Sequence, residues 1–206
     1  MTKSERSCYF VFMKKGDDTK IKILDKGFEL ASKLGLECLS IGTLATATDM
    51  SKSGLFGHFH SKENLQLNVM EHAGEIFNQD VIAPALKAPA GIPRIRKIME
   101  NWIHWTKELS GGCIFVAAAA EYSDRPGLVR DFILEQQKSW IDCLGRIAGS
   151  AVRVGDFRAD TNCDLFAFEL YSLILGFFLY HSSLDYPGAG DLMSQSFERL
   201  INSYKP

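Results

Sequence analysis

Residues 51–58 carry side chains well suited to contact a nucleic acid. They read Ser-Lys-Ser-Gly-Leu-Phe-Gly-His, so small and polar residues surround one lysine and one histidine. Small side chains let the backbone of a helix lie deep in the major groove, and the amide groups at its N-terminus can donate to phosphate oxygens. The segment therefore predicts a short recognition helix for duplex DNA.

A recognition helix needs a bracing helix and a tight turn before it, and the preceding residues supply both. Ser40 can cap a short helix that breaks at Thr48-Asp49-Met50. Asp49 stands at the turn, where a residue that tolerates positive φ is needed. The buried contacts between the two helices are expected from Leu44, Ala45, Met50, Leu55 and Phe59.

Helical periodicity runs through nearly the whole chain, because apolar residues recur at three- and four-residue steps. The first helix is expected to begin at Asp18 or Thr19 and to stop at Gly35. No segment shows convincing strand periodicity. The predicted fold class is therefore all-α, with about nine helices.

The helix after the recognition segment is predicted to begin at Ser61, a good N-cap, and to run to about Ile82. Pro84 and Pro89 are expected to end it there. The later helices are expected near 92–109, 113–122, 126–150, 161–184 and 189–204.

Composition and charge limit the classes of function. The 206 residues have a net charge of −2, which argues against a protein that coats nucleic acid non-specifically. Residues 1–62 nevertheless hold ten lysines and arginines against seven acidic residues, which suits local phosphate contact. The five cysteines show no metal-ligand spacing, and the apolar run Leu170–Tyr180 is shorter than a membrane span. These features predict a soluble cytoplasmic protein that has no metal.

Residues 21–65 resemble the DNA-binding region of the TetR family of bacterial repressors. The residues that carry the resemblance are Gly35-Leu36, Ser40-Ile41-Gly42-Thr43-Leu44-Ala45, Met50-Ser51-Lys52-Ser53-Gly54-Leu55-Phe56-Gly57-His58-Phe59 and Ser61-Lys62-Glu63-Asn64-Leu65. The resemblance implies three domain-level parts, which are a flexible N-terminal extension (1–17), a helix-turn-helix DNA-binding domain (18–65) and a helical ligand-binding and dimerisation domain (66–206).

The resemblance also implies DNA-contacting roles for individual residues. Lys62 matches the lysine that clamps a backbone phosphate, where its charge and the helix N-terminus act together. Base edges would be read at Lys52, Ser53 and Gly54, and Lys52 can donate to a guanine. The remaining contacts, to phosphates or bases, are assigned to Ser40, Thr43, Phe56 and His58.

The recognition segment departs from the family pattern at a few positions. Phe56 replaces the usual tyrosine, and the loss of one hydrogen bond to phosphate costs roughly 0.5–1.5 kcal/mol. Gly54 and Gly57 leave the groove-facing surface bare, and each costs roughly 1 kcal/mol of helix stability relative to alanine. Asp49 adds a negative charge near DNA. These departures predict moderate affinity for each half-site.

Residues 92–206 contain no phosphate-binding loop, nucleophile elbow or helical metal pair, and they are rich in aromatic residues. The resemblance implies an inducer site among the middle helices, so an apolar or aromatic small molecule is expected, with no cofactor. The predicted lining residues are Trp102, Trp105, Phe115 and Tyr122, with His104 and Glu121 as polar handles.

The segment 161–184 is apolar nearly all round, which predicts burial on two sides. One small domain provides only one such side, so a partner chain is expected to provide the other. The resemblance likewise implies a homodimer through the last two helices, about 161–204, and hence a roughly palindromic operator.

The leading functional prediction is a repressor that a small-molecule inducer releases from a palindromic operator, and the protein is not expected to be an enzyme. A ligand-dependent activator and a helical dimer with weakened DNA binding stay open as alternatives. A small helical enzyme using Cys113, His104 or Glu121 is disfavoured because no base–nucleophile spacing supports it.

Overall fold

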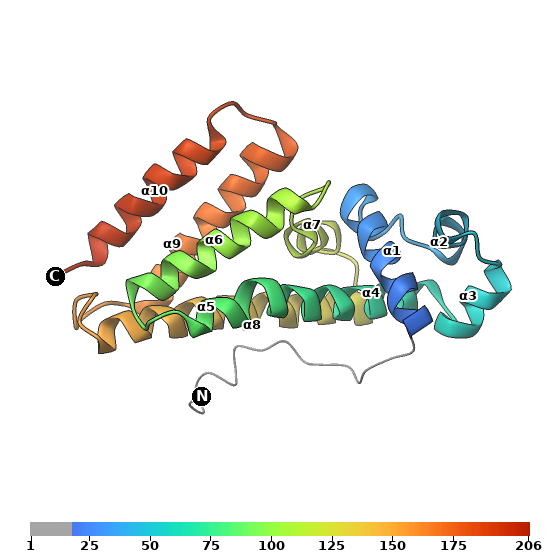
Figure 1. Cartoon of the computed structure of the whole chain (residues 1–206), viewed down its shortest axis with the longest axis horizontal. Helices are drawn as coiled ribbons and strands as arrows, with labels where there is room; N and C mark the ends of the chain where they lie inside the picture. The colour runs from blue at the N-terminus through green and yellow to red at the C-terminus, as the bar shows by residue number, and fades with distance from the viewer. Residues whose placement is uncertain (1–17) are drawn as a thin grey trace. The chain divides into compact units, whose positions relative to one another are not determined.

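The computed structural model describes residues 18–206, which form helices joined by short loops and contain no strand (Figure 1). The predicted extension 1–17 lies outside the described residues. The prediction of an all-α fold is confirmed. The ten α-helical segments form nine continuous helices over this range, because a π-helical segment joins two of them end to end.

The described residues separate into two compact units. We call residues 18–78 and 107–137 the head unit, and residues 79–106 and 138–206 the body unit. The head unit thus contains a stretch from the middle of the chain in addition to the predicted DNA-binding residues. The functional boundary at residue 65 stays a prediction.

The first four helices of the head unit begin and end close to the residues that their caps predict. They are α1 (Asp18–Leu34), α2 (Ile41–Thr48), α3 (Lys52–Phe59) and α4 (Lys62–Phe77). Gly35 has φ +89° just after α1, and Asp49 has φ 54° just after α2, so both adopt the left-handed conformation expected of them. His60 also adopts it, with φ 62°, and this was not expected.

The helix that begins at Lys62 does not end near Ile82. A π-helical segment, η2 (Asn78–Ile82), follows α4 and leads directly into α5 (Ala83–Lys87). Pro84 stands in the first turn of α5, where its missing N–H breaks no hydrogen bond within that α-helix. The predicted stop at Pro84 is therefore wrong.

The middle of the chain contributes α7 (Ile114–Glu121) and the first turns of α8 (Leu128–Arg153) to the head unit. A Cβ added at Gly111 would lie only 1.6 Å from the carbonyl oxygen of Ser32, so the loop before α7 packs directly on the end of α1. Phe115 of α7 stacks edge-on against Phe77 of α4, with 5.5 Å between ring centroids. These contacts fix α7 to α1 and α4.

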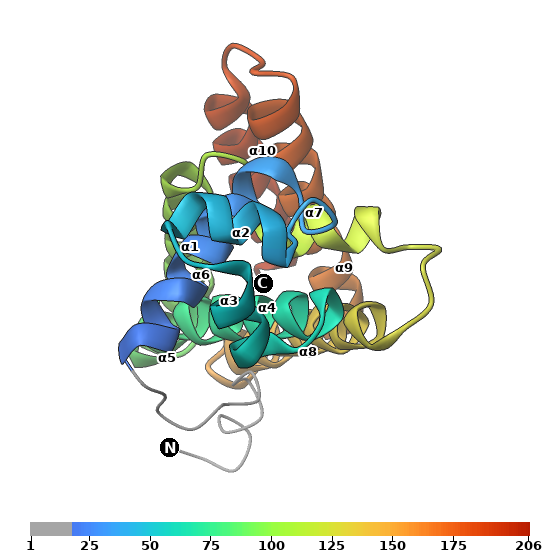
Figure 2. The ribbon, with the colours of Figure 1, turned by 90° about the vertical axis from the view of Figure 1, so that its right-hand side faces the viewer.

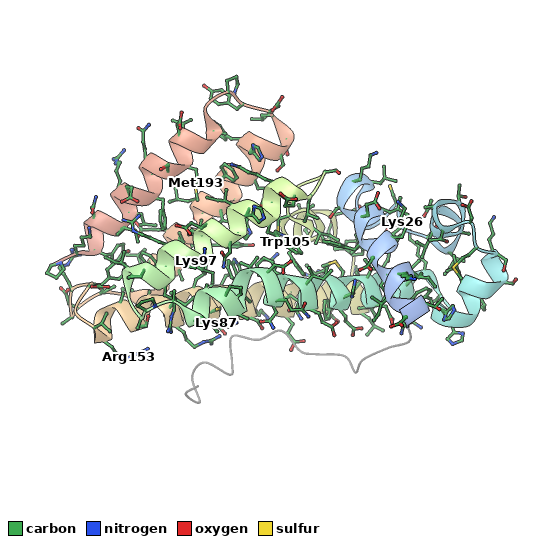
Figure 3. The ribbon with its side chains drawn as sticks, in the orientation of Figure 1. Lys26, Lys87, Lys97, Trp105, Arg153 and Met193 are labelled. Atoms are coloured by element: carbon green, nitrogen blue, oxygen red, sulfur yellow. The ribbon has the colours of Figure 1, made fainter. Side chains whose placement is uncertain are left out.

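The body unit is built around α6 (Ile92–Glu108), the rest of α8, α9 (Cys163–Phe178) and α10 (Ala189–Tyr204). Helices α9 and α10 lie side by side, joined through the π-helical turn η3 (Leu179–Ser183) (Figure 2). Phe157, Phe166 and Tyr204 pack together with ring centroids 5.1–5.6 Å apart. In Figure 3, Lys97 marks α6 and Met193 marks α10, and these two helices are linked by an ion pair between Arg96 and Glu198.

Helix α9 is longer than its most apolar run. Together with η3 it forms a 21-residue segment, Cys163–Ser183, whose length and composition would suffice to cross a membrane. The expectation that this region is too short is therefore wrong. One face of α9 is buried in the body unit through Phe166, Ala167, Leu170, Ile174 and Phe177.

The opposite face of α9 is exposed and apolar. Leu165, Phe168, Leu175 and Leu179 are 49, 69, 41 and 49% exposed. Steps of three, seven and four residues place all four on one side of the helix. We call these four residues the α9 stripe.

Candidate nucleic-acid interface

The head unit presents almost the whole of α3 to the surroundings. Leu55 and Phe59 are buried, at 0 and 1% exposure, and pin the helix to its neighbours. Every other residue of α3 is exposed, and these include the predicted contacts Lys52, Ser53, Gly54, Phe56 and His58. The structure therefore brings these predicted contacts together on one short helix.

Helix α2 braces α3 and contributes two buried residues to the core of the head unit. Leu44 and Ala45 are 0 and 6% exposed, as predicted for the bracing helix. Met50, predicted to be a third buried contact, is only half-buried. It lies in the turn between α2 and α3 and not on the inner face of either helix.

The N-terminus of α3 is held by Ser51, whose Oγ accepts from the backbone N–H of Gly54 at 3.1 Å. A Cβ added at Gly54 would lie 3.1 Å from that same oxygen, whereas one at Gly57 would meet nothing within 4 Å. Gly54 therefore gives the cap room, which explains one of the two unusual glycines. The structure does not explain Gly57.

Ser40 and Thr43 form a reciprocal cap at the start of α2. Thr43 N–H donates to Ser40 Oγ at 3.1 Å, and Ser40 N–H donates to Thr43 Oγ1 at 2.9 Å. Two otherwise unpaired amide groups are satisfied in this way. The two hydroxyls thus have a structural role, and their predicted phosphate contacts stay predictions.

Lys62 stands at the N-terminus of α4, and its ammonium group forms an ion pair. Its Nζ donates to Glu37 Oε1 at 2.7 Å, and both side chains are about 40% exposed. The other oxygen of Glu37 accepts from the Tyr122 hydroxyl at 2.9 Å and lies 3.1 Å from Arg125 Nη1. We call Glu37, Lys62, Tyr122 and Arg125 the Glu37 cluster.

The cluster keeps Glu37 ionised. The hydrogen bond from Lys62 lowers the pKa of this carboxyl below its usual value, and the bond from Tyr122 and the charges of Lys62 and Arg125 act in the same direction. Burial and the bond to Glu37 raise the pKa of Tyr122, so its phenol stays a donor. A hollow of about 320 Å³ borders the cluster and is also lined by Glu63 and Arg130.

Glu121 braces the loop from which Glu37 extends. Its two carboxylate oxygens accept from the backbone N–H groups of Leu36 and Glu37 at 2.9 and 3.0 Å. Glu121 thus caps the end of the α1 region and is held inside the head unit. Its expected role as a polar handle for the inducer gains no support from these contacts.

The four aromatic residues predicted to line an inducer site are all buried. Trp102 and Trp105 belong to the body unit, where the Trp102 ring lies 6.0 Å from that of Phe177. Phe115 and Tyr122 belong to the head unit, and Tyr122 bonds to Glu37. Their assignment to a ligand site stays a prediction.

The body unit also contains two hollows beside α10. One, of about 270 Å³, lies between α9, η3 and α10 and includes Phe177, Tyr180 and Met193 in its lining. The other, of about 200 Å³, lies between α6 and α10 beside the Arg96–Glu198 pair. The sequence predicted no site at either hollow, because the helices that form them meet only in the folded chain.

Two family models match this chain. A model described as "Tetracyclin repressor-like, C-terminal domain" matches residues 91–197, and one described as "Bacterial regulatory proteins, tetR family" matches residues 23–69. The first match alone covers more than half of the 206 residues. The chain belongs to the TetR family.

Individual relatives agree with this assignment. The HTH-type transcriptional repressor DhaR of Mycobacterium sp. (strain GP1) is 24% identical over 148 residues, or 70% of this chain and 73% of DhaR. The structure of a TetR-family regulator from Cytophaga hutchinsonii has a TM-score of 0.79 at 20% identity, covering 93% of this chain and 98% of that one. The structure of AibR in complex with isovaleryl coenzyme A and operator DNA has a TM-score of 0.67 at 22% identity, covering 90% of this chain and 97% of AibR.

Membership of the TetR family fixes the broad activity. The chain is a DNA-binding transcriptional regulator and not an enzyme. The matched N-terminal region, residues 23–69, contains α2, α3 and Lys62.

Proposed function

We propose that this TetR-family regulator is a homodimeric repressor that occupies a palindromic operator and is released from it by a small molecule. The observation that carries the proposal is the exposed face of α3, which rests on the buried pins Leu55 and Phe59. Lys52 and Ser53 would contact base edges, and Gly54 would let the backbone approach them. Ser40, Thr43, Phe56, His58 and Lys62 would contact the phosphate backbone or neighbouring bases.

The α9 stripe supports the dimer. Four large apolar side chains between 41 and 69% exposed are a poor surface for a monomer, and their spacing matches the seam of a helix pair. Pairing two copies through α9 and α10 would present two α3 helices to successive major grooves. Such a two-fold arrangement requires a palindromic operator.

The inducer is proposed to be apolar or aromatic, with Trp102, Trp105, Phe115 and Tyr122 as the residues that recognise it. Support for a small-molecule ligand comes from AibR, whose structure contains isovaleryl coenzyme A together with operator DNA. Release requires the inducer to bind the DNA-free arrangement more tightly than the DNA-bound one.

The test is the binding of the full-length protein to the duplex upstream of its own gene, followed by fluorescence anisotropy. We expect a complex that weakens steeply with salt, because lysine contacts release counterions from the phosphates. Lys52→Ala should weaken the complex, whereas Lys138→Ala, an exposed lysine of α8, should not. Absence of any complex with this duplex at low salt would reject the proposal.

A further inference from the structure

The lysine expected to clamp a phosphate is already bound to a carboxylate of its own chain. Glu37 Oε1 accepts from Lys62 Nζ at 2.7 Å, so it offers Lys62 an anionic oxygen of the kind that a phosphate would offer. Lys62 cannot satisfy both partners with its full charge. Contact with DNA must therefore weaken or break the bond to Glu37.

The same carboxylate has a second set of partners. Glu37 Oε2 accepts from the Tyr122 hydroxyl at 2.9 Å and lies 3.1 Å from Arg125. Tyr122 follows α7 directly, and Arg125 lies in the loop between α7 and α8. The strength with which Glu37 holds Lys62 thus depends on side chains outside the helix-turn-helix.

We propose that Glu37 is a positioning residue that competes with DNA phosphate for Lys62, and that Tyr122 and Arg125 set the strength of this competition. The inference rests on the proposed contact between Lys62 and phosphate. When Tyr122 and Arg125 hold Glu37, its charge is shared and Lys62 transfers to DNA more readily. When α7 shifts and these bonds lengthen, Glu37 holds Lys62 more strongly and DNA binding weakens.

Helix α7 also holds the backbone of the loop that carries Glu37. Glu121, the last residue of α7, accepts from the amides of Leu36 and Glu37, so the helix that holds the backbone at Glu37 is the one that Tyr122 directly follows. A Cβ at Gly35 would lie 3.0 Å from Glu121 Oε1, which shows how closely the loop is packed on this carboxylate. A displacement of α7 therefore acts on both the backbone and the side chain of Glu37.

The first experiment is a double-mutant cycle on operator affinity, using Glu37→Gln, Lys62→Met and the double variant in the full-length protein. Glu37→Gln should tighten binding about two- to fivefold, the range of a partly exposed ion pair. In the Lys62→Met background the same change should alter affinity less than about 1.5-fold. Glu63→Gln removes an exposed charge beside Lys62 and is the matched control, with an equal effect in both backgrounds.

The second experiment tests the contribution of α7. Tyr122→Phe keeps the buried ring and removes only the donor, so it should weaken operator binding about twofold and lose this effect in the Glu37→Gln background. Arg125→Gln should behave in the same way. If Arg125 instead contacts DNA itself, its effect will persist in that background and will overturn its assigned role.

The outcomes separate the inference from the function on which it rests. If the wild type binds the operator and Lys62→Met weakens binding, but Glu37→Gln acts equally in both backgrounds, the competition is refuted and the DNA-binding proposal stands. If Lys62→Met leaves affinity and its salt dependence unchanged, Lys62 makes no phosphate contact and the inference fails with that contact. A normal thermal unfolding midpoint for each variant shows that folding is intact.

Discussion

Helices α3 and α9 both leave a large face exposed, but the chemistry of the two faces is opposite. The exposed face of α3 consists of small and polar residues and the single large apolar side chain of Phe56, whereas α9 presents four large apolar side chains. Both helices have a buried side that fixes them in their own unit. The difference is consistent with the two partners that we propose, since small polar side chains suit a DNA groove and an apolar stripe suits another protein surface.

The largest expected effect comes from truncating a buried side chain of α3. Phe59→Ala should lower the free energy of unfolding by about 3–5 kcal/mol, because it empties a fully buried ring site. Phe56→Ala, three residues away and 54% exposed, should change it by less than about 0.5 kcal/mol. Urea unfolding of both variants measures this contrast, and equal losses would contradict the assignment of the two faces.

The exposed side of α9 should behave in the opposite way. Phe168→Glu is expected to leave the protomer folded and to raise the dimer dissociation constant about 30-fold or more, since a charge would replace the largest and most exposed side chain of the stripe. Sedimentation velocity across a concentration series measures the constant. Leu128→Glu changes another exposed leucine, on α8, and should leave it unaltered. Dimerisation unaffected by Phe168→Glu would exclude the α9 stripe as the interface.

A hydrogen bond between α10 and α9 makes the free energy of unfolding depend on pH. The Tyr204 hydroxyl donates to Glu169 of α9, and burial together with this bond raises the pKa of Tyr204 to about 12. An unfolded tyrosine ionises near pH 10, so this contribution to stability is complete below that value and is lost as the pH rises toward 12.

Between pH 9 and pH 11 the loss should be about 1 kcal/mol in the wild type, beyond what Tyr204→Phe loses. Urea unfolding of the wild type and of Tyr204→Phe at both pH values measures the contribution of the Tyr204 hydroxyl, because the other groups of the two proteins titrate alike. The same decrease in both would show that Tyr204 does not supply it.

The smallest effect distinguishes the two glycines of α3. Gly57→Ala should raise the free energy of unfolding by about 0.5–1 kcal/mol, since alanine favours helix and the added Cβ meets nothing within 4 Å. Gly54→Ala should gain less, because its Cβ would press on Ser51 Oγ at 3.1 Å. Thermal unfolding midpoints rank the two variants, and a larger gain at position 54 would contradict the role of the cap.

Local signals in the sequence were enough to predict most of the helices. Ser40, Ser51 and Ser61 cap α2, α3 and α4 because an N-cap depends only on residues within one turn, and Gly35 ends α1 for a similarly local reason. The face of α3 followed from the same pattern. The π-helical segment at Asn78–Ile82 was missed, since no feature of its composition distinguishes it from an ordinary helix.

The Glu37 cluster could not be found in this way. Glu37 is 25 residues from Lys62 and 85 from Tyr122, and neither separation is a spacing that one helix or turn brings together. Tyr122 was expected to line an inducer site because the family resemblance implies such a site among the middle helices. In the folded chain the Tyr122 hydroxyl donates a hydrogen bond to the Glu37 carboxylate, which lies in the loop before the helix-turn-helix.

The most direct test of the DNA-binding account is the salt dependence of operator affinity for the wild type and Lys62→Ala. The account predicts that Lys62→Ala weakens binding and reduces the slope of log K against log salt by about 0.9, the value for one phosphate contact. The matched Lys138→Ala variant should keep the wild-type slope. An unchanged slope for Lys62→Ala would contradict the claim that the start of α4 clamps the DNA backbone beside α3.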